Sequence, residues 1–117
     1  QEGPAGIKMA VSDKINSGYV YQPEQIDFEP ASCEAPNVWK RIGEDKWVLM
    51  YDIFSINPHN FGFAETSDFV NFTHLGHFNE GQMKTTNFSS PKHGAVIQVS
   101  KEEAQRLAAH WDLQIEF

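Results

Sequence analysis

"CEAPNVWKRIGEDKWVLMYDIF", residues 33–54, decides the fold class of this chain. Two segments rich in β-branched and aromatic residues, 36–41 and 46–54, flank the turn sequence Gly-Glu-Asp-Lys at 43–46. Such residues favour strands, and glycine beside aspartate favours a tight connection between strands. The stretch therefore predicts an antiparallel β-hairpin.

Strand signals of the same kind recur along most of the chain. The other candidate strands are 7–11, 18–22, 61–66, 72–78 and 93–99. Gly, Pro, Asn and Asp interrupt them about every ten residues, as in all-β domains. After residue 99 the pattern becomes helical, because Ser100 and Glu103 have the spacing of a capping box. We expect an all-β fold with one short C-terminal α-helix.

Length and composition limit the classes of function. The chain has 117 residues, room for one domain, and it is 40% hydrophobic with a net charge of −7. A negative charge without runs of Lys or Arg argues against nucleic acid and against an anionic membrane surface. No apolar run in the sequence approaches the roughly 18 residues of a membrane-spanning helix, and residues 1–10 do not resemble a signal peptide. The single cysteine, Cys33, forms no internal disulfide and is typical of a small buried residue.

A weak internal repeat suggests a radial arrangement of sheets. Ser-Asp pairs at 12–13 and 67–68 each follow a candidate strand, and they are 55 residues apart. Propeller blades repeat every 40 to 50 residues or so, and closed propellers have about four to eight blades. The strands here make up about two blades. We expect residues 1–30 to end one blade, residues 31–80 to form a full blade, and residues 81–117 to supply a closing strand and the helix.

Glu34 is the first candidate for chemistry. It stands at the entrance of a strand, before an Ala-Pro step in which Pro36 favours extended geometry at Ala35. Beside the apolar segments that follow, its carboxyl group would be partly desolvated and its pKa raised. A general acid needs that property near neutral pH. The alternative is a solvated glutamate in a turn.

Three segments carry a family resemblance. Residues 33–54 are similar to the "Glu-Gly-Pro or Glu-Ala-Pro, strand, turn, strand" segment of family 43 glycoside hydrolases. "PKHGAVIQVSKEEAQRL" at 91–107 resembles the Arg-His-Gly segment near the end of the same catalytic domain, and "ETSDFVNFTHLG" at 65–76 matches a strand end between them. The resemblance implies a partial five-bladed β-propeller, the C-terminal portion of an arabinosidase or xylosidase domain.

The resemblance also implies roles for individual residues. Glu34 would be the general acid that protonates the departing glycosidic oxygen. His93 would lie under the sugar near the propeller axis, and Asp52 and Phe54 would be rim residues that hydrogen-bond to and stack on a sugar ring. Lys92 stands where the family often has arginine. From the residues alone, a buried His93 and a strand-capping Asp52 remain open alternatives.

The family hydrolyses arabinose- and xylose-containing glycans with inversion, using two carboxylates about 6.5 to 9.5 Å apart. The matching base lies in blades that this chain is not expected to contain, so we expect the chain alone to be inactive. The implied partner is an oligosaccharide or polysaccharide, with no cofactor. The resemblance also implies an exported protein, secreted or periplasmic.

Two alternatives belong to other classes. One is a non-catalytic carbohydrate-binding or self-assembling module, in which exposed strand edges pair two copies into a homo-oligomer. The other is an unrelated small β-sandwich, in which Glu34 and His93 need not approach each other.

The remaining histidines form no recognisable metal motif; they are His59, His74, His77 and His110. His74 and His77 are three apart in a predicted strand, a spacing that puts them on opposite faces. We therefore expect no metal site.

Overall fold

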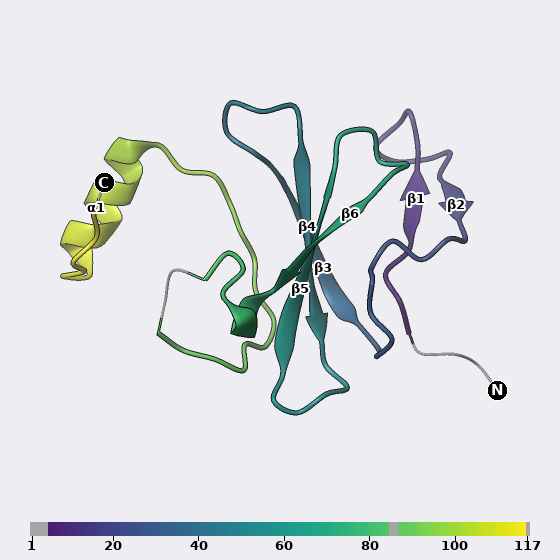
Figure 1. Ribbon diagram of the computed structural model, residues 1–117. Helices are drawn as coiled ribbons and strands as arrows, with labels where there is room; N and C mark the ends of the chain where they lie inside the picture. Colours follow the sequence, from purple (N-terminus) through teal and green to yellow (C-terminus); the bar gives the residue numbers. More distant parts are fainter. Residues whose placement is uncertain (1–4, 85–86, 117) are drawn as a thin grey trace.

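The computed structural model describes residues 5–84 and 87–116 and consists mainly of two antiparallel β-sheets (Figure 1). The smaller sheet pairs β1 (Met9–Val11) with β2 (Val20–Gln22). The larger sheet has four strands in chain order: β3 (Glu34–Lys40), β4 (Trp47–Ile53), β5 (Asn60–Thr66) and β6 (Thr73–His77). The 3-10 turn η1 (Phe78–Glu80) and the helix α1 (Lys101–His110) follow. The all-β prediction with one short helix is confirmed; the division into propeller blades stays a prediction.

The hairpin predicted from residues 33–54 is present as β3 and β4. Arg41 N donates to Lys46 O at 2.9 Å and closes the connection. Gly43 has φ +76°, a left-handed conformation that glycine adopts without the cost a side chain brings. The Gly-Glu-Asp-Lys turn thus aligns the two strands that carry the candidate site.

β4 is the centre of the core, because both of its faces are covered. Leu49 and Tyr51 pack on one face with the cluster Ile7, Cys33, Ile53 and Ala64. Val48 and Met50 pack on the other face with Phe61, Phe63 and Phe78. We call these the Tyr51 face and the Met50 face. Burial on both sides explains why the β4 sequence is a continuous apolar run rather than an alternating one.

A β-bulge in β6 changes which side chains share a face. Ala64 pairs with His74 while Phe63 pairs with Gly76, so β6 has one extra residue at this point. Gly76 has φ +119°, a conformation that glycine tolerates in a bulge. His77 lies opposite Gly62, which in turn lies opposite Tyr51.

The bulge therefore brings His74 and His77 together. His74 pairs with Ala64 of the Tyr51 face, and the ring centroids of the two histidines are 5.0 Å apart. The sequence prediction that these histidines point to opposite faces is wrong, because it assumed an uninterrupted strand.

Residues 93–99 form no strand, which corrects another prediction. Val96 N donates to the Asn37 side chain at 2.8 Å rather than to a backbone carbonyl, and Ile97 is 81% exposed. The segment runs beside β3 without joining its hydrogen-bond ladder. Every other predicted strand overlaps one of the six strands found in residues 5–84 and 87–116.

The predicted capping box is confirmed at the start of α1. Glu103 N donates to Ser100 Oγ at 3.2 Å, and Ser100 N donates to Glu103 Oε2 at 2.8 Å. The helix stands away from the sheets (Figure 1), and Leu107 is 52% exposed. The radius of gyration, 16.2 Å, accordingly exceeds the value of about 13 Å for a compact domain of this length.

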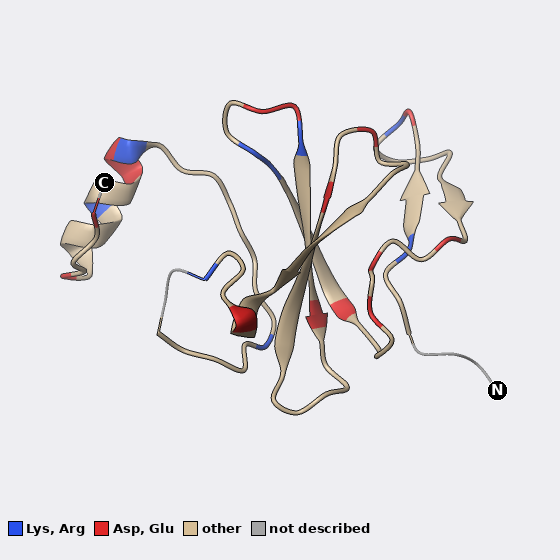
Figure 2. Ribbon diagram, viewed as in Figure 1, with Lys and Arg blue, Asp and Glu red and all other residues tan. Residues whose placement is uncertain are grey.

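Charged residues are scattered over the described part of the chain rather than gathered on a basic face (Figure 2). Acidic residues mark the adjacent ends of β3 and β4, where Glu34 and Asp52 pair in register. In residues 5–84 and 87–116, no helix has the length and apolarity needed to cross a membrane.

Candidate functional site

Glu34 is positioned by a bulge at the start of β3. Glu34 pairs with Asp52 and Asn37 pairs with Met50, so three steps along β3 match two along β4. Ala35, inside the bulge, has φ +49°. The left-handed conformation contradicts the extended geometry predicted from Pro36, and such outliers in non-glycine residues are frequent at functional sites. The bulge lets the Glu34 carboxylate reach the chain segment that crosses the Met50 face.

His93 arrives on that crossing segment. Its neighbour Gly94 passes so close to the sheet that a Cβ would lie 3.3 Å from Met50 and Phe61 atoms. His93 has φ +43°, and its backbone N–H donates to Asp52 Oδ2 at 3.1 Å. The buried aspartate thus anchors the segment at the position that brings the imidazole to Glu34.

Glu34, Lys92 and His93 converge at the end of the sheet. Glu34 Oε1 lies 3.0 Å from His93 Nε2 and 3.4 Å from Lys92 Nζ. Lys92 Nζ also lies 3.7 Å from Asp52 Oδ2. Glu34 and His93 are 59 positions apart in the sequence, and their approach agrees with the roles that the family resemblance implies.

The electrostatics of Glu34 differ from the prediction. Its pKa is lowered, first by the hydrogen bond from His93 and then by Lys92, which together outweigh desolvation. The Glu34 side chain is 42% exposed. The sequence predicted a raised pKa because it counted the apolar surroundings and not the cations. In this structure Glu34 is an ionised carboxylate at neutral pH.

Asp52 and Phe54 have different surroundings. Asp52 is not at the rim, because its side chain is fully buried, and its Oδ1 has no hydrogen-bond partner among the described residues. Its strand position brings it under His93 and Lys92 rather than into contact with solvent. Phe54 is half-buried, and Lys92 Nζ lies 5.7 Å from its ring centroid. A role for either residue in sugar binding stays a prediction.

The cluster can hydrogen-bond to hydroxyl groups and can transfer a proton. Glu34, Asp52 and His93 offer ligand-type atoms that all lie within 4.8 Å of one another. A cation in this place would compete with the Lys92 ammonium group, which already contacts both carboxylates. The separation of the two carboxylates is shorter than the roughly 6.5 to 9.5 Å of an inverting acid and base.

Sequence reasoning undervalued Lys92. The resemblance gave Lys92 only as a residue that stands where the family often has arginine, yet its ammonium group reaches Glu34, Asp52 and the Phe54 ring. The signal was present in the sequence, since Lys92 directly precedes His93 and a long cationic side chain can span such a distance.

The comparison with protein families gives the class of domain to which this chain belongs. A model of the family 43-related glycosyl hydrolases, described as "Probable glycosyl hydrolase domain", matches residues 1–105. The chain therefore belongs to the family 43-related glycosyl hydrolase domains. No curated protein and no solved structure matches it.

Proposed function

We propose that this domain acts on arabinose- or xylose-containing glycans as part of an inverting glycoside hydrolase of an exported protein. Glu34 is the general acid, while Phe54 and His93 contact the sugar and Asp52 holds the segment that carries His93. The observation that carries the proposal is the 3.0 Å approach of His93 Nε2 to Glu34 Oε1 on an exposed edge of the sheet.

The state of Glu34 sets a condition for catalysis. A general acid must be protonated when substrate is bound, whereas the free site holds an ionised carboxylate. A sugar stacked on Phe54 would exclude water and move Lys92 away from Glu34. Both changes raise the pKa of the carboxyl group. Glu34 then gains its proton as the substrate binds.

The second carboxylate of an inverting reaction has to come from elsewhere. Asp52 is buried and lies too close to Glu34 to leave room for a water molecule on the opposite side of the sugar. We therefore propose that the 117-residue chain alone lacks the base and does not complete hydrolysis.

Azide rescue provides the test. Azide can attack the anomeric carbon of an aryl arabinoside or xyloside in place of activated water, while Glu34 protonates the departing aryl oxide. We expect the chain to release the aryl group only when azide is added, with the glycosyl azide of inverted configuration as the product. Glu34→Gln should not form this product. Hydrolysis without azide, at a rate that Glu34→Gln leaves unchanged, would contradict the assignment.

A second candidate is a carbohydrate-binding module without catalysis. The lowered pKa of Glu34 and the short Glu34–Asp52 separation favour it, since both suit binding of hydroxyl groups better than proton donation. Isothermal titration with xylo- and arabino-oligosaccharides separates the two candidates. Binding that Phe54→Ala abolishes, together with no glycosyl azide, supports the module.

Self-association of that module is a further part of this candidate. β3 and β6 are the outer strands of the larger sheet, and at the start of β2 in the smaller sheet Tyr19, Val20 and Tyr21 are each about 60% exposed. An apolar hollow of about 550 Å³ lies between the small sheet and the Tyr51 face. We propose a second copy of the chain as its partner. Sedimentation that stays monomeric at all concentrations would contradict this.

A further inference from the structure

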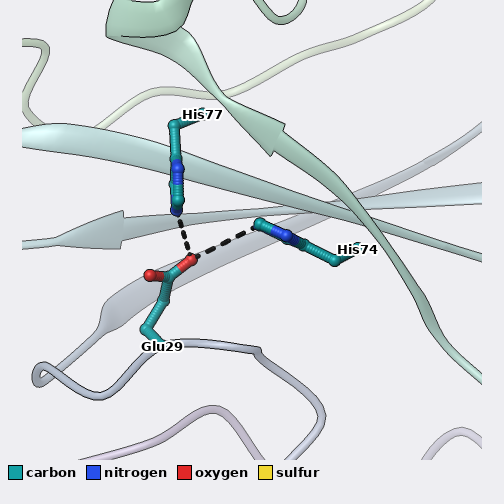
Figure 3. Close-up of side chains that lie close together, drawn as sticks. All are labelled: Glu29, His74 and His77. Atoms are coloured by element: carbon teal, nitrogen blue, oxygen red, sulfur yellow. Dashed lines mark hydrogen bonds and ion pairs between the residues drawn. The ribbon is translucent and has the colours of Figure 1, made fainter.

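Three side chains with metal-ligating atoms converge on the Tyr51 face (Figure 3). One oxygen of Glu29 faces both His74 and His77. Glu29 Oε1 lies 2.7 Å from His77 Nε2 and 3.7 Å from His74 Nε2, and the three atoms all lie within 4.8 Å of one another. The residues come from a loop and from both sides of the β6 bulge.

The loop holds Glu29 in place before any ligand binds. Asp27, itself buried, accepts from Glu29 N at 2.9 Å through Oδ1 and from Ile7 N at 2.7 Å through Oδ2. The Tyr51 hydroxyl donates to Glu29 Oε1 at 3.0 Å. The carboxylate is therefore fixed both through its backbone and through its own oxygen.

The two imidazoles are also oriented by their surroundings. Phe28 stacks on His74 with ring centroids 5.4 Å apart. The second ring nitrogen of His77, Nδ1, lies 4.0 Å from Glu80 Oε2. Glu80 in turn accepts from Asn60 Nδ2 at 3.1 Å. At metal sites a carboxylate in this place usually accepts a hydrogen bond from the ligating histidine, and the 4.0 Å separation here is longer than such a bond.

Burial makes the partners of the Glu29 carboxylate energetically important. The Glu29 side chain is 6% exposed, whereas His74 and His77 are 35% and 27% exposed. A buried carboxylate needs a cation or hydrogen bonds to offset the loss of water. The carboxylate is therefore the most buried of the three groups, and both imidazoles are partly exposed to solvent.

We propose that Glu29, His74 and His77 bind a divalent transition-metal ion, with zinc as the fitting metal. Two imidazole nitrogens and one carboxylate oxygen are ligands that zinc prefers, whereas calcium and magnesium prefer oxygen alone. Zinc bonds of about 2.0 to 2.2 Å at tetrahedral angles put ligand atoms about 3.3 Å apart. The observed 2.7 and 3.7 Å bracket that value. Solvent occupies the fourth position.

This site is separate from the one at Glu34. Asp52 follows Tyr51 in β4, and successive side chains of a strand point to opposite faces. The Glu34 cluster therefore lies on the Met50 face and the Glu29 cluster on the Tyr51 face. The two clusters also differ in their basic residues. The ammonium group of Lys92 contacts Glu34 and Asp52, whereas Glu29 is paired with the imidazoles of His74 and His77.

Zinc titration of the full chain tests the proposal. We expect isothermal titration to find a single high-affinity site and cobalt to give the intense visible absorption of four-coordinate nitrogen and oxygen ligation. His74→Gln and His77→Gln should each weaken zinc binding by more than about 100-fold, because outer partners alone contribute about 10- to 100-fold. His110→Gln, on the exposed end of α1, is the matched control and should bind zinc as the wild type does.

Imidazole NMR of the wild-type chain gives a readout that does not depend on the folding of any variant. Zinc should shift the ring nitrogens of His74 and His77 and leave those of His93 unchanged. Zinc-dependent shifts at His93, or loss of binding in His93→Gln, would overturn the proposal by assigning the ion to the other cluster. Affinity in the wild type no greater than in the doubly substituted His74→Gln/His77→Gln chain would overturn it as well.

Discussion

Replacing Tyr51 by phenylalanine should destabilise the domain by about 1.5 to 3 kcal/mol. The ring is fully buried, and a Cβ on Gly62 would lie 2.3 Å from Tyr51 Cε2, so the ring is fixed against β5. Phenylalanine keeps this packing and removes only the hydroxyl group. Burial and the charge of Glu29 raise the pKa of Tyr51, so the hydroxyl remains a donor throughout the neutral range.

The magnitude follows from the hydrogen bonds that are lost. The hydroxyl donates to Glu29 Oε1 at 3.0 Å, and a hydrogen bond to a charged group contributes about 1.5 to 3 kcal/mol. Phe28 N lies 3.5 Å from the same hydroxyl, too long to add much. Glu29 keeps His77 at 2.7 Å, so the carboxylate is not left without a partner.

Urea unfolding in the presence of a chelator measures this loss. If the free energy of unfolding falls by about 1.5 kcal/mol per molar urea, the urea concentration at half-unfolding should drop by about 1 to 2 M. Tyr21→Phe is the control, since Tyr21 is 60% exposed and its change should stay within about 0.5 kcal/mol. If Tyr51→Phe is no more destabilising than Tyr21→Phe, the reasoning about the Glu29 contact is refuted.

Three further predictions concern other parts of the chain. Ser100→Ala should weaken α1 by about 1 kcal/mol, seen as faster amide exchange in the helix with little change in the urea midpoint, because the helix stands away from the sheets. The pKa of Glu34 is lowered in the folded chain, chiefly by His93. Glu34 therefore stabilises the fold at pH values above the usual carboxyl pKa, and this stabilisation is lost as the pH falls through the pKa that Glu34 has in the folded chain. NMR titration should find a higher pKa for Glu34 in His93→Ala than in the wild type. Burial, followed by the charge of Asp27, raises the pKa of the Cys33 thiol to about 12, so a thiol reagent at pH 8 should label Cys33 only after unfolding, and rapid labelling of the folded chain would count against its burial.

The sequence was sufficient for the elements that depend on local patterns. The hairpin of β3 and β4 followed from its turn and its aromatic residues, and the start of α1 followed from the Ser100 and Glu103 pair. Residues 93–99 were mistaken for a strand because β-branched residues there resemble one. Their backbone runs beside β3 but meets the Asn37 side chain instead of a ladder. Propensity cannot distinguish an extended segment from a paired strand.

The candidate site, too, could be predicted from the sequence only in part. The approach of Glu34 to His93 was implied by the family resemblance, since no spacing rule links residues so far apart. The pKa of Glu34 was predicted in the wrong direction because the position of Lys92 is a tertiary property. His74 and His77 were assigned to opposite faces because the strand was assumed to alternate regularly. Gly76 lies between them, and a glycine inside a strand is a recognised signal for a bulge.

The two bulges have a consequence for how such a domain changes over generations. Each lies in an outer strand, at Ala35 in β3 and at Leu75 in β6, while β4 and β5 pair without interruption. Each bulge absorbs one extra residue, so the side chains on both sides of it keep their partners: Glu34 still faces Asp52 and His74 still faces Ala64. The outer strands can therefore take up a change of one residue in length without rebuilding the interior, where β4 and β5 pair continuously.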